Sequence, residues 1–521
     1  MLGRRVFIRQ VGLVTMAGIL LPDLLNYKNH TVKLPRSTPE AQGVSTAAIH
    51  KYFDAIEKSG QEFHATMIVK NGHVIAEAWW SPYRSDHRMQ LYSMSKSFTS
   101  TAVGFAQQEN LLNVEDYVID YFKDVLPDNL SDHLKKLKIK HLLMMGVGMA
   151  KDSILIIEKS PVGTPWAKTF LSLPIDFEPG TKFLYNSGAS FMLSNIVQKV
   201  SGKTAHEFLR PRLYQPLGIV NTTWSTNPEG FNFGASHLRL TTEDMAKFGQ
   251  FYLQNGMWNG KQILNPDYIR AATSKQISNG NKDSSWAYGY GYQFWLNPTG
   301  GFRADGAFGQ YSMVFPDQNA VVAINSESLG KADTMNIVWD ILWPELNKKT
   351  SQISNPAELK KLKKRLDQLH YDPPQYVYAS DQEEKIENKT YFFDENDLGI
   401  ESLTFHSKKK TIAFDVKEKG LATYMITCGR NTWISKGNIK PLPHALFSRR
   451  RIDFDSITAA AAGWEKQNVL KISMRFIETC HGDYLTCVFD GDTVTISPLF
   501  SVQRAQNKPD DRRDLVGRTM N

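Results

Sequence analysis

At 521 residues the chain is long for a single hydrophobic core, so two domains with terminal segments are expected. Hydrophobic residues make up 41% of the chain and charged residues 22%, as in ordinary globular proteins. The net charge is +8, but the basic runs at 360–365, 408–410 and 449–451 are short and typical of solvated faces, and no nucleic-acid-binding motif accompanies them. Composition therefore argues against a nucleic-acid partner, and no cysteine or histidine spacing indicates a metal site.

The first 26 residues differ from the rest of the chain. The segment Arg4-Arg5-Val6-Phe7-Ile8-Arg9 precedes the apolar run Val11–Leu21, and together they resemble a twin-arginine export signal. A helix over that run would reach only about 17 Å, short of the roughly 30 Å hydrocarbon core of a membrane. Residues 1–26 are predicted to be an export signal or, because no clear Ala-x-Ala cleavage site follows, a short retained membrane anchor. This places the protein in the periplasm or cell envelope; the alternative is a buried amphipathic N-terminal helix.

Residues 37–350 combine strand and helix signals. Phe63–Val69 and His73–Trp79 form a predicted hairpin, and Tyr311–Phe315 with Ala320–Asn325 form another. The segments between them contain candidate helices at 93–107, 189–200 and 242–254. The pattern predicts an α+β domain in which helices flank an antiparallel sheet and form a separate cluster.

The C-terminal part of the chain has a different pattern from residues 37–350. Residues 351–375 contain a Lys-rich helical pattern closed by Pro373-Pro374, predicted to be a charged linker helix. Residues 376–502 carry short strand signals separated by turns, which suits a small β-barrel. We expect the charged tail, residues 503–521, to be disordered. Cys480 and Cys487 flank a predicted turn and either form a disulfide or are buried apolar side chains; the spacing does not decide.

The first candidate for chemistry is Ser93 with Lys96. Positions three apart on a helix share a face, so the lysine is expected beside the hydroxyl. The small and apolar residues at 97–106 predict a buried helix, in which a neutral lysine can accept the serine proton. The same spacing occurs at Ser328 and Ser407 in polar stretches, and the motif alone fits equally well a helix-capping serine with an exposed lysine.

Two further segments complete the candidate site. Tyr185 can relay a proton, since a nearby cationic lysine favours its phenolate, and Ser187 shares its direction if the segment is extended. The glycine-rich segment Ala304–Gln310 lets the backbone approach a ligand, and the N–H groups of Ala307 and Ser93 would form an oxyanion hole. Taken alone, the Tyr185 segment also fits an ordinary turn, and the glycine-rich segment is better explained as a turn before a strand.

The ordered set of Ser-x-x-Lys, Tyr-x-Ser and a glycine-rich strand entry resembles the serine β-lactamase and penicillin-binding-protein superfamily, and within it the class C-like esterases and 6-aminohexanoate-dimer hydrolases. The resemblance covers residues 39–325, and the C-terminal region resembles the lipocalin-like domain that some members carry. It implies that Ser93 is the acylated nucleophile, Lys96 the general base and Tyr185 the proton relay. Ala307 and Ser93 would supply the oxyanion N–H groups, with Ser187, Asp305 and Gly306 against the substrate. The implied acyl transfer to water needs no cofactor.

Two departures from the superfamily pattern bear on the substrate. Ser187 stands where β-lactamases usually carry Asn, and Ala304-Asp305-Gly306 stands where they carry Lys-Thr-Gly, whose lysine attracts the substrate carboxylate. An ester or amide hydrolase acting on small molecules is therefore predicted. A β-lactamase or D-Ala-D-Ala carboxypeptidase is the first alternative, and a non-catalytic ligand-binding protein on the same fold is the second. The aromatic stretch 286–295 either lines an acyl pocket or packs in the core.

Overall fold

The computed structural model describes residues 32–280, 284–330, 333–348, 355–376, 380–396, 398–437, 439–441 and 455–520. The predicted export segment lies outside the described residues. Among the helices that are described, none combines the length and the apolar character needed to cross a membrane.

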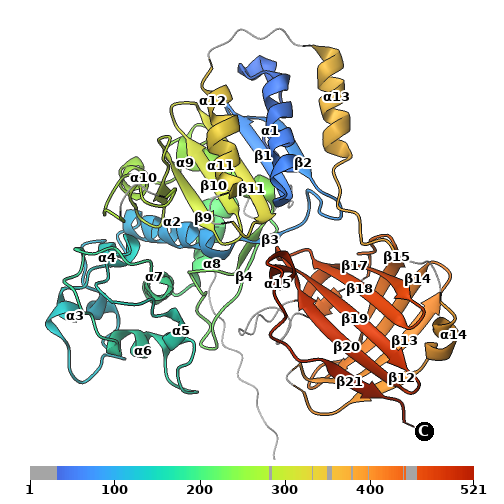
Figure 1. The fold of residues 1–521 in the computed structure, drawn as a ribbon. Helices are drawn as coiled ribbons and strands as arrows, with labels where there is room; N and C mark the ends of the chain where they lie inside the picture. The colour runs from blue at the N-terminus through green and yellow to red at the C-terminus, as the bar shows by residue number, and fades with distance from the viewer. Residues whose placement is uncertain are drawn as a thin grey trace, which may run out of the picture.

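A six-stranded antiparallel sheet organises the first domain (Figure 1). Its strand order is β2-β1-β11-β10-β9-β8, so segments from the two ends of the domain pair at its centre. Both predicted hairpins are present, and the first turns through Asn71 and Gly72, which have φ of 51° and 77°. The strands are β1 (Glu62–Lys70), β2 (His73–Trp79), β8 (Trp295–Leu296), β9 (Phe302–Gly306), β10 (Gln310–Phe315) and β11 (Ala320–Glu327).

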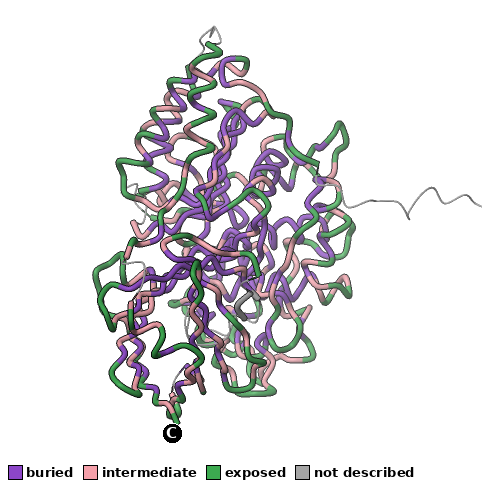
Figure 2. The backbone as a smooth tube through the Cα atoms, turned by 90° about the vertical axis from the view of Figure 1, so that its right-hand side faces the viewer, coloured by how far each residue is buried: buried purple, intermediate pink, exposed green. Residues whose placement is uncertain are grey.

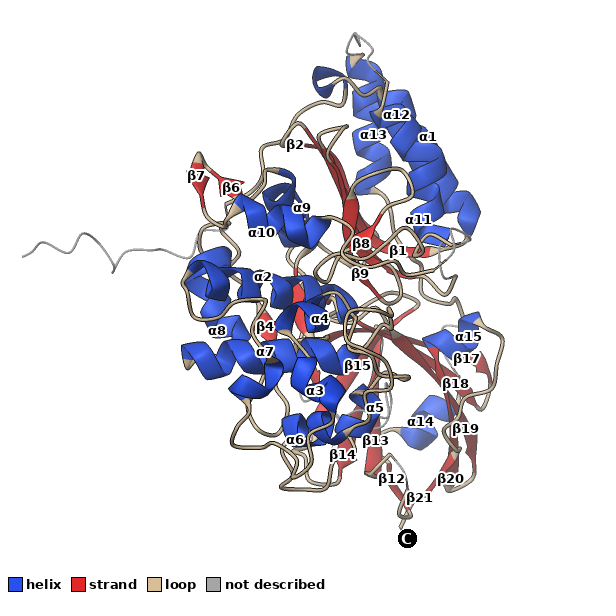
Figure 3. Ribbon diagram, turned by 90° about the vertical axis from the view of Figure 1, so that its left-hand side faces the viewer, coloured by secondary structure: helices blue, strands red, loops and turns tan. Residues whose placement is uncertain are grey.

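Helices cover both faces of this sheet, as Figure 3 shows. Successive strand residues point to opposite faces, so Met67 and Ile68 enter two different hydrophobic cores. One face packs against α1 (Thr46–Ser59), α11 (Asp333–Ile337) and α12 (Trp343–Leu346). The other packs against α9 (Thr242–Leu253). Buried backbone accordingly runs through the middle of the molecule in Figure 2, with exposed residues on its outer turns.

A helical cluster adjoins the second face and confirms the predicted α+β architecture. At its centre α2 (Ser95–Gln108) packs against α7 (Ser187–Ser201). The other helices are α3 (Asp132–Lys136), α4 (Ile139–Leu143), α5 (Ile154–Ile157), α6 (Trp166–Ser172), α8 (Ala205–Leu209) and α10 (Pro266–Thr273). Two further small sheets belong to this domain: β3 (Met89–Gln90), β5 (Leu238–Leu240) and β4 (Thr223–Trp224) form one, and β6 (Met257–Trp258) with β7 (Lys261–Gln262) forms the other.

The predicted linker helix is part of the first domain. α13 (Pro356–Asp367) packs against α1 and β2, with Leu362 buried in the core on that face of the sheet. Arg365 forms ion pairs with Asp54 at 2.7 Å and Glu57 at 3.0 Å on α1. The lysine-rich side of α13 is solvated as expected, but its opposite side is docked, so this segment does not act as a free spacer.

The C-terminal domain is a β-barrel, as predicted, and nine of its described strands close on themselves through a short parallel contact between β15 and β17. The strands of the closed barrel are β12 (Thr390–Phe393), β13 (Ile400–Lys408), β14 (Thr411–Glu418), β15 (Tyr424–Arg430), β17 (Asp455–Lys466), β18 (Val469–Phe476), β19 (Gly482–Asp490), β20 (Thr493–Phe500) and β21 (Leu515–Arg518). Beside β17 lies the short β16 (Ile439–Pro441), and α14 (Gln382–Ile386) precedes β12.

The prediction of a disordered tail is wrong for the described residues. After α15 (Ser501–Ala505), β21 pairs with β20 on one side and with β12 on the other, which closes the barrel. Arg512 holds the connecting segment through Asp510 at 2.7 Å and Asp483 at 2.8 Å. The charges that suggested disorder therefore form ion pairs that order the tail.

The structure also answers the question of the cysteines. Cys480 and Cys487 are both buried free thiols, each 1% exposed. Cys487 lies in the barrel core, whereas Cys480 lies in the turn that follows β18 and faces the first domain. Of the two predicted alternatives, a disulfide or buried apolar side chains, the structure shows the second.

Candidate active site

Ser93 lies in a tight turn, Tyr92–Met94, that leads directly into α2. Lys96, one helical turn further on, donates from Nζ to Ser93 Oγ at 3.1 Å and to the Ala235 carbonyl oxygen at 3.0 Å. The lysine is 1% exposed. The serine and lysine are therefore placed as the spacing predicts, with the lysine side-chain nitrogen enclosed by protein.

The helix behind Ser93 is fixed on all sides. Every residue from Ser95 to Ala106 is buried. Ser95 Oγ donates to the Tyr92 carbonyl at 2.7 Å and accepts from the Leu238 N–H at 3.2 Å, which ties the turn to β5. Further along α2, the backbone at Gly104 packs tightly against the Tyr268 ring. A Cβ at this position would lie 2.6 Å from the ring. These contacts hold the nucleophile turn rigidly against the domain.

Tyr185 completes a compact group with Ser93 and Lys96. Its hydroxyl hydrogen-bonds to Ser93, and Lys96 Nζ lies 4.9 Å from the centre of its ring. Trp295 stacks on the same ring at 5.4 Å. Burial raises the pKa of Tyr185 well above its ordinary value, and the hydrogen bond to Ser93 opposes this only in part. The neutral phenol is thus favoured, not the phenolate that a neighbouring lysine suggests, and the hydroxyl is suited to donate a proton.

The glycine-rich segment after β9 passes close to the nucleophile turn. A Cβ on Gly306 would lie 2.2 Å from the Leu91 carbonyl oxygen and 3.2 Å from the Met94 nitrogen, so only glycine permits this approach. Ala307, next in the chain, is exposed. Phe308 has a φ of 63°, and its carbonyl accepts from Ser326 Oγ at 2.8 Å and from the Ser328 N–H at 2.9 Å.

Asp305 follows Ala304, the residue that stands at the lysine position of the superfamily pattern, and its carboxylate is bound by two neighbouring side chains. Its Oδ2 accepts from Arg303 Nε at 2.9 Å and Trp286 Nε1 at 2.8 Å. Arg303 is fully buried. Burial raises the pKa of Asp305, and the Arg303 guanidinium acts in the opposite direction. The Arg303 guanidinium is therefore paired with Asp305 beneath the surface, and it does not present a positive charge to the cleft.

Ser187 does not lie in an extended segment, which was the condition for its side chain to share the direction of Tyr185. The segment is extended only as far as Asn186, whose Oδ1 accepts from the Gly188 N–H at 3.0 Å and caps α7. Ser187 is therefore the first helical residue, and its N–H donates to Asp152 Oδ1 at 2.8 Å. Asp152 was not singled out by the sequence, although its charge acts on Tyr185.

The aromatic stretch is divided between the hydrophobic core and the surroundings of the site. Tyr290 and Phe294 are buried in the core, each 1% exposed. Trp295 supports the Tyr185 ring, and Trp286 borders a pocket of about 340 Å³ beside the oxyanion segment. The pocket is lined by residues 305–309 together with Trp286, Tyr311, Ser328, Leu329, Gly330 and Gln506. Its volume lies within the roughly 300–1,000 Å³ typical of small-molecule sites.

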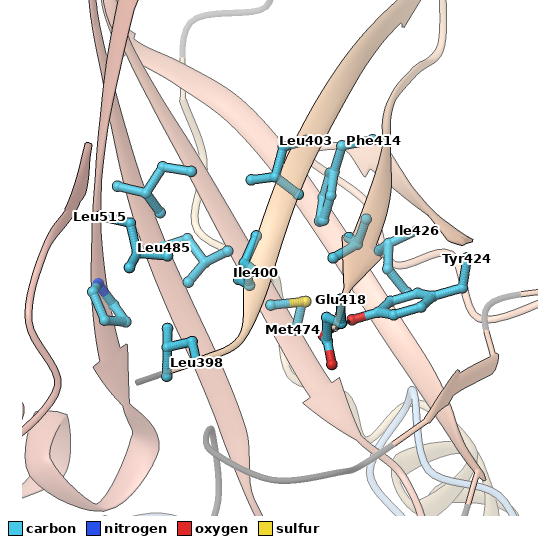
Figure 4. A pocket seen from close by; sticks show the side chains of 13 residues that line it. Leu398, Ile400, Leu403, Phe414, Glu418, Tyr424, Ile426, Met474, Leu485 and Leu515 are labelled. Atoms are coloured by element: carbon cyan, nitrogen blue, oxygen red, sulfur yellow. Dashed lines mark hydrogen bonds between the residues drawn. The ribbon is translucent and has the colours of Figure 1, made fainter. Parts of the chain in front are cut away.

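The barrel interior offers much less space. Figure 4 shows its apolar cavity, which holds about 40 Å³ and is lined by side chains such as Leu403 and Met474. At one end the Tyr424 hydroxyl donates to Glu418. This space is well below the roughly 300–1,000 Å³ typical of small-molecule sites. Among the described residues, no group of three or more His, Cys, Asp and Glu side chains is arranged to hold a metal ion.

Comparisons with known proteins bear on the family and the fold. Residues 53–342 match the family model described as Beta-lactamase. An uncharacterized protein of Alkalihalophilus pseudofirmus is 21% identical over 335 residues, covering 56% of this chain and 91% of that protein. The 6-aminohexanoate-dimer hydrolase of Paenarthrobacter ureafaciens is 23% identical over 281 residues, covering 50% and 71%. A solved structure from Bacillus anthracis, provisionally assigned as a 6-aminohexanoate-dimer hydrolase, has a TM-score of 0.50 at 19% identity, covering 63% of this chain and 90% of that one.

Proposed function

Because the chain belongs to the β-lactamase family of serine hydrolases, we propose that it cleaves ester or amide bonds of small substrates through an acyl-enzyme on Ser93. The observation that carries the proposal is the compact group in which Lys96 Nζ lies 3.1 Å from Ser93 Oγ while Tyr185 contacts both. A nucleophile, a base and a proton donor within one compact group are what acyl transfer requires.

In acylation, neutral Lys96 takes the Ser93 proton as Oγ forms a bond to the substrate carbonyl carbon. The negative charge that develops on the carbonyl oxygen is stabilised by the backbone N–H groups of Ser93 and Ala307. As the bond to the leaving group breaks, Tyr185 gives it a proton and recovers one from protonated Lys96. Water then attacks the acyl-enzyme with the same groups in the reverse roles, which releases the acid and restores the serine.

The substrate is expected to lack a carboxylate beside the scissile bond. Asp305 would repel such a group, and Arg303 is already paired with it beneath the surface. The pocket bordered by Trp286 and Phe308 is suited instead to a neutral acyl or leaving group of small size. This favours the esterase or amidase over the β-lactamase alternative.

The test uses p-nitrophenyl esters of short acids, short amides and nitrocefin. Ser93→Ala and Lys96→Ala are each expected to lower kcat by about a thousandfold or more. Ser407→Ala is the matched control. Ser407 and Lys410 have the same spacing but lie in the barrel, so this substitution should leave activity unchanged. Ester turnover that survives Ser93→Ala would overturn the proposal. Stoichiometric labelling of Ser93 by a fluorescent penicillin would favour the β-lactam alternative.

Export is a separate proposal, supported by the paired Arg4 and Arg5 ahead of an apolar run. Replacing both arginines with lysine is expected to retain the protein in the cytoplasm, as measured by cell fractionation. Unchanged recovery in the periplasmic fraction would refute this route.

A further inference from the structure

The barrel reaches the active site through the turn between β18 and β19. Cys480, in this turn, donates from its thiol to Tyr92 Oη at 3.7 Å. The ring of His481 meets the ring of Tyr92 nearly edge-on, at 5.9 Å and 78°, and that of Phe308 at 4.6 Å and 86°. Tyr92 and Phe308 in turn contact each other at 5.3 Å. One imidazole from the second domain thus packs on two aromatic residues of the first.

These two aromatic residues flank the two expected oxyanion donors. Tyr92 precedes Ser93, and Phe308 follows Ala307. Their φ angles are 49° and 63°, in the left-handed region that bulky side chains rarely adopt. Such a conformation costs about 1–3 kcal/mol and persists only where surrounding contacts enforce it. The direction of the Ser93 and Ala307 N–H groups therefore depends on what holds the Tyr92 and Phe308 rings.

His481 is itself held from the first domain. Its Nδ1 lies 2.6 Å from Glu327 Oε1, which also accepts from Ser501 Oγ at 2.5 Å. Glu327 stands between Ser326 and Ser328, the two residues that bind the Phe308 carbonyl. His481 and Glu327 are 6% and 8% exposed. The end of β11 therefore fixes the oxyanion segment with its serines and fixes the imidazole against that segment with its glutamate.

Other contacts dock the barrel independently of this ring. The Gln90 N–H donates to the Glu478 carbonyl at 3.0 Å, and Arg88 Nε donates to the Glu478 carboxylate at 2.8 Å. Arg475 forms an ion pair with Glu62. Gln506, just beyond α15, also borders the pocket beside Ala307. Removing the imidazole alone is therefore expected to leave the two domains together.

We propose that His481 of the barrel is a positioning residue for the oxyanion hole, acting through its ring contacts with Tyr92 and Phe308. The barrel is then a wall of the active site and not a separate binding module. The inference rests on the proposed acyl-transfer function and extends it to the second domain. In this proposal the His481 ring positions the oxyanion segment, whereas the hydrogen bond between His481 and Glu327 stabilises the fold.

Two substitutions separate these contributions. His481→Gln keeps a donor for Glu327 and loses the ring, so it should unfold at a urea concentration near that of the unaltered protein while kcat falls about 10- to 100-fold with little change in KM. His481→Phe keeps a ring and leaves the buried Glu327 carboxylate with Ser501 alone, so it should be less stable but retain most of kcat. His406→Gln is the matched control, since His406 bonds Asp415 on the barrel and should leave kcat unchanged.

The readouts are ester kinetics, urea midpoints and the rate of Ser93 phosphonylation by a phosphonate ester. Activity that follows stability across the variants, or a His481→Gln protein with unaltered kcat, would overturn the inference. If His481→Gln does not fold, His481→Phe decides: high kcat despite lower stability supports the inference, and a kcat reduced tenfold or more overturns it. If Ser93→Ala is inactive and His481→Gln keeps its kcat, this inference alone is refuted. If Ser93→Ala remains active, the proposed function is refuted.

Discussion

Replacing Gly306 with alanine tests how closely β9 must approach the nucleophile turn. The added Cβ would lie 2.2 Å from the Leu91 carbonyl oxygen, whereas an ordinary contact begins near 3.4 Å. Neither the new Cβ nor the Leu91 carbonyl oxygen can rotate away, because both are fixed by the backbone. The strand and the turn must therefore separate by about 1 Å. Because Ala307 follows Gly306 directly, its N–H moves with the strand.

A misplacement of about 1 Å is sufficient to cost roughly a hundredfold in rate. We therefore expect Gly306→Ala to lower kcat for a p-nitrophenyl ester by about that factor, equivalent to about 2.7 kcal/mol of transition-state stabilisation. KM should change little, since the loss falls on a contact made with the developing oxyanion.

The control is Gly249→Ala on α9, where the new Cβ would meet Ser312 Oγ at 2.5 Å and Val321 Cγ1 at 2.6 Å in the core. The crowding is comparable but lies away from the site, so this variant should lose stability and keep its kcat. Stopped-flow acylation and urea unfolding of both variants give the comparison. A Gly306→Ala enzyme whose kcat stays within about threefold of the original would refute the argument.

Three further expectations follow from the same contacts. Tyr185→Phe keeps the ring that Trp295 supports and loses only the proton donor, so kcat should fall about 10²- to 10⁴-fold, measured with an ester of a poor leaving group; an unaltered rate would exclude the relay. Burial raises the pKa of Glu62, but Arg475 and His64 outweigh it and hold that pKa below the ordinary 4.5. The charged form then stabilises the fold above pH 4.5 and loses this effect as the pH falls below it; Glu62→Gln should flatten urea midpoints over that acidic range, and unchanged acid sensitivity would count against the ion pair. Ending the chain after Asn507 removes β21 and exposes the edges of β12 and β20, so size-exclusion chromatography should show association; a monomer of unaltered stability would contradict the role of β21.

The parts of the fold that sequence predicts are those with strong local signals. The β1–β2 hairpin has apolar runs around Asn71-Gly72, whose turn geometry is local. β17 carries no such signal, because the run Ala459–Ala462 has low strand propensity and only pairing on both sides makes it a strand. β21 is hidden for a related reason: four residues carry no periodicity, and one of the two partner strands, β12, lies at the far end of the barrel sequence.

The same distinction applies to the site. Ser93 and Lys96 are adjacent because the spacing is helical, and this could be predicted from the sequence. The helix that begins at Ser187 could also be predicted from a local signal, since Asn186 is a favourable residue to begin a helix. Asp152 and His481 reach the site only through tertiary structure, and no spacing in one sequence encodes such contacts.

The pairing pattern of the two domains sets the order in which activity can arise during folding. In the first domain Glu62 pairs with Glu327, and in the barrel Phe392 pairs with Arg518, so each sheet closes only when distant segments meet. Such non-local topologies fold slowly, and the barrel turn that carries His481 cannot reach Tyr92 until both are formed. During refolding from urea, we expect esterase activity to recover later than the burial of Trp464 in the barrel core. A folded hydrolase domain would then exist briefly as a native-like but slow enzyme.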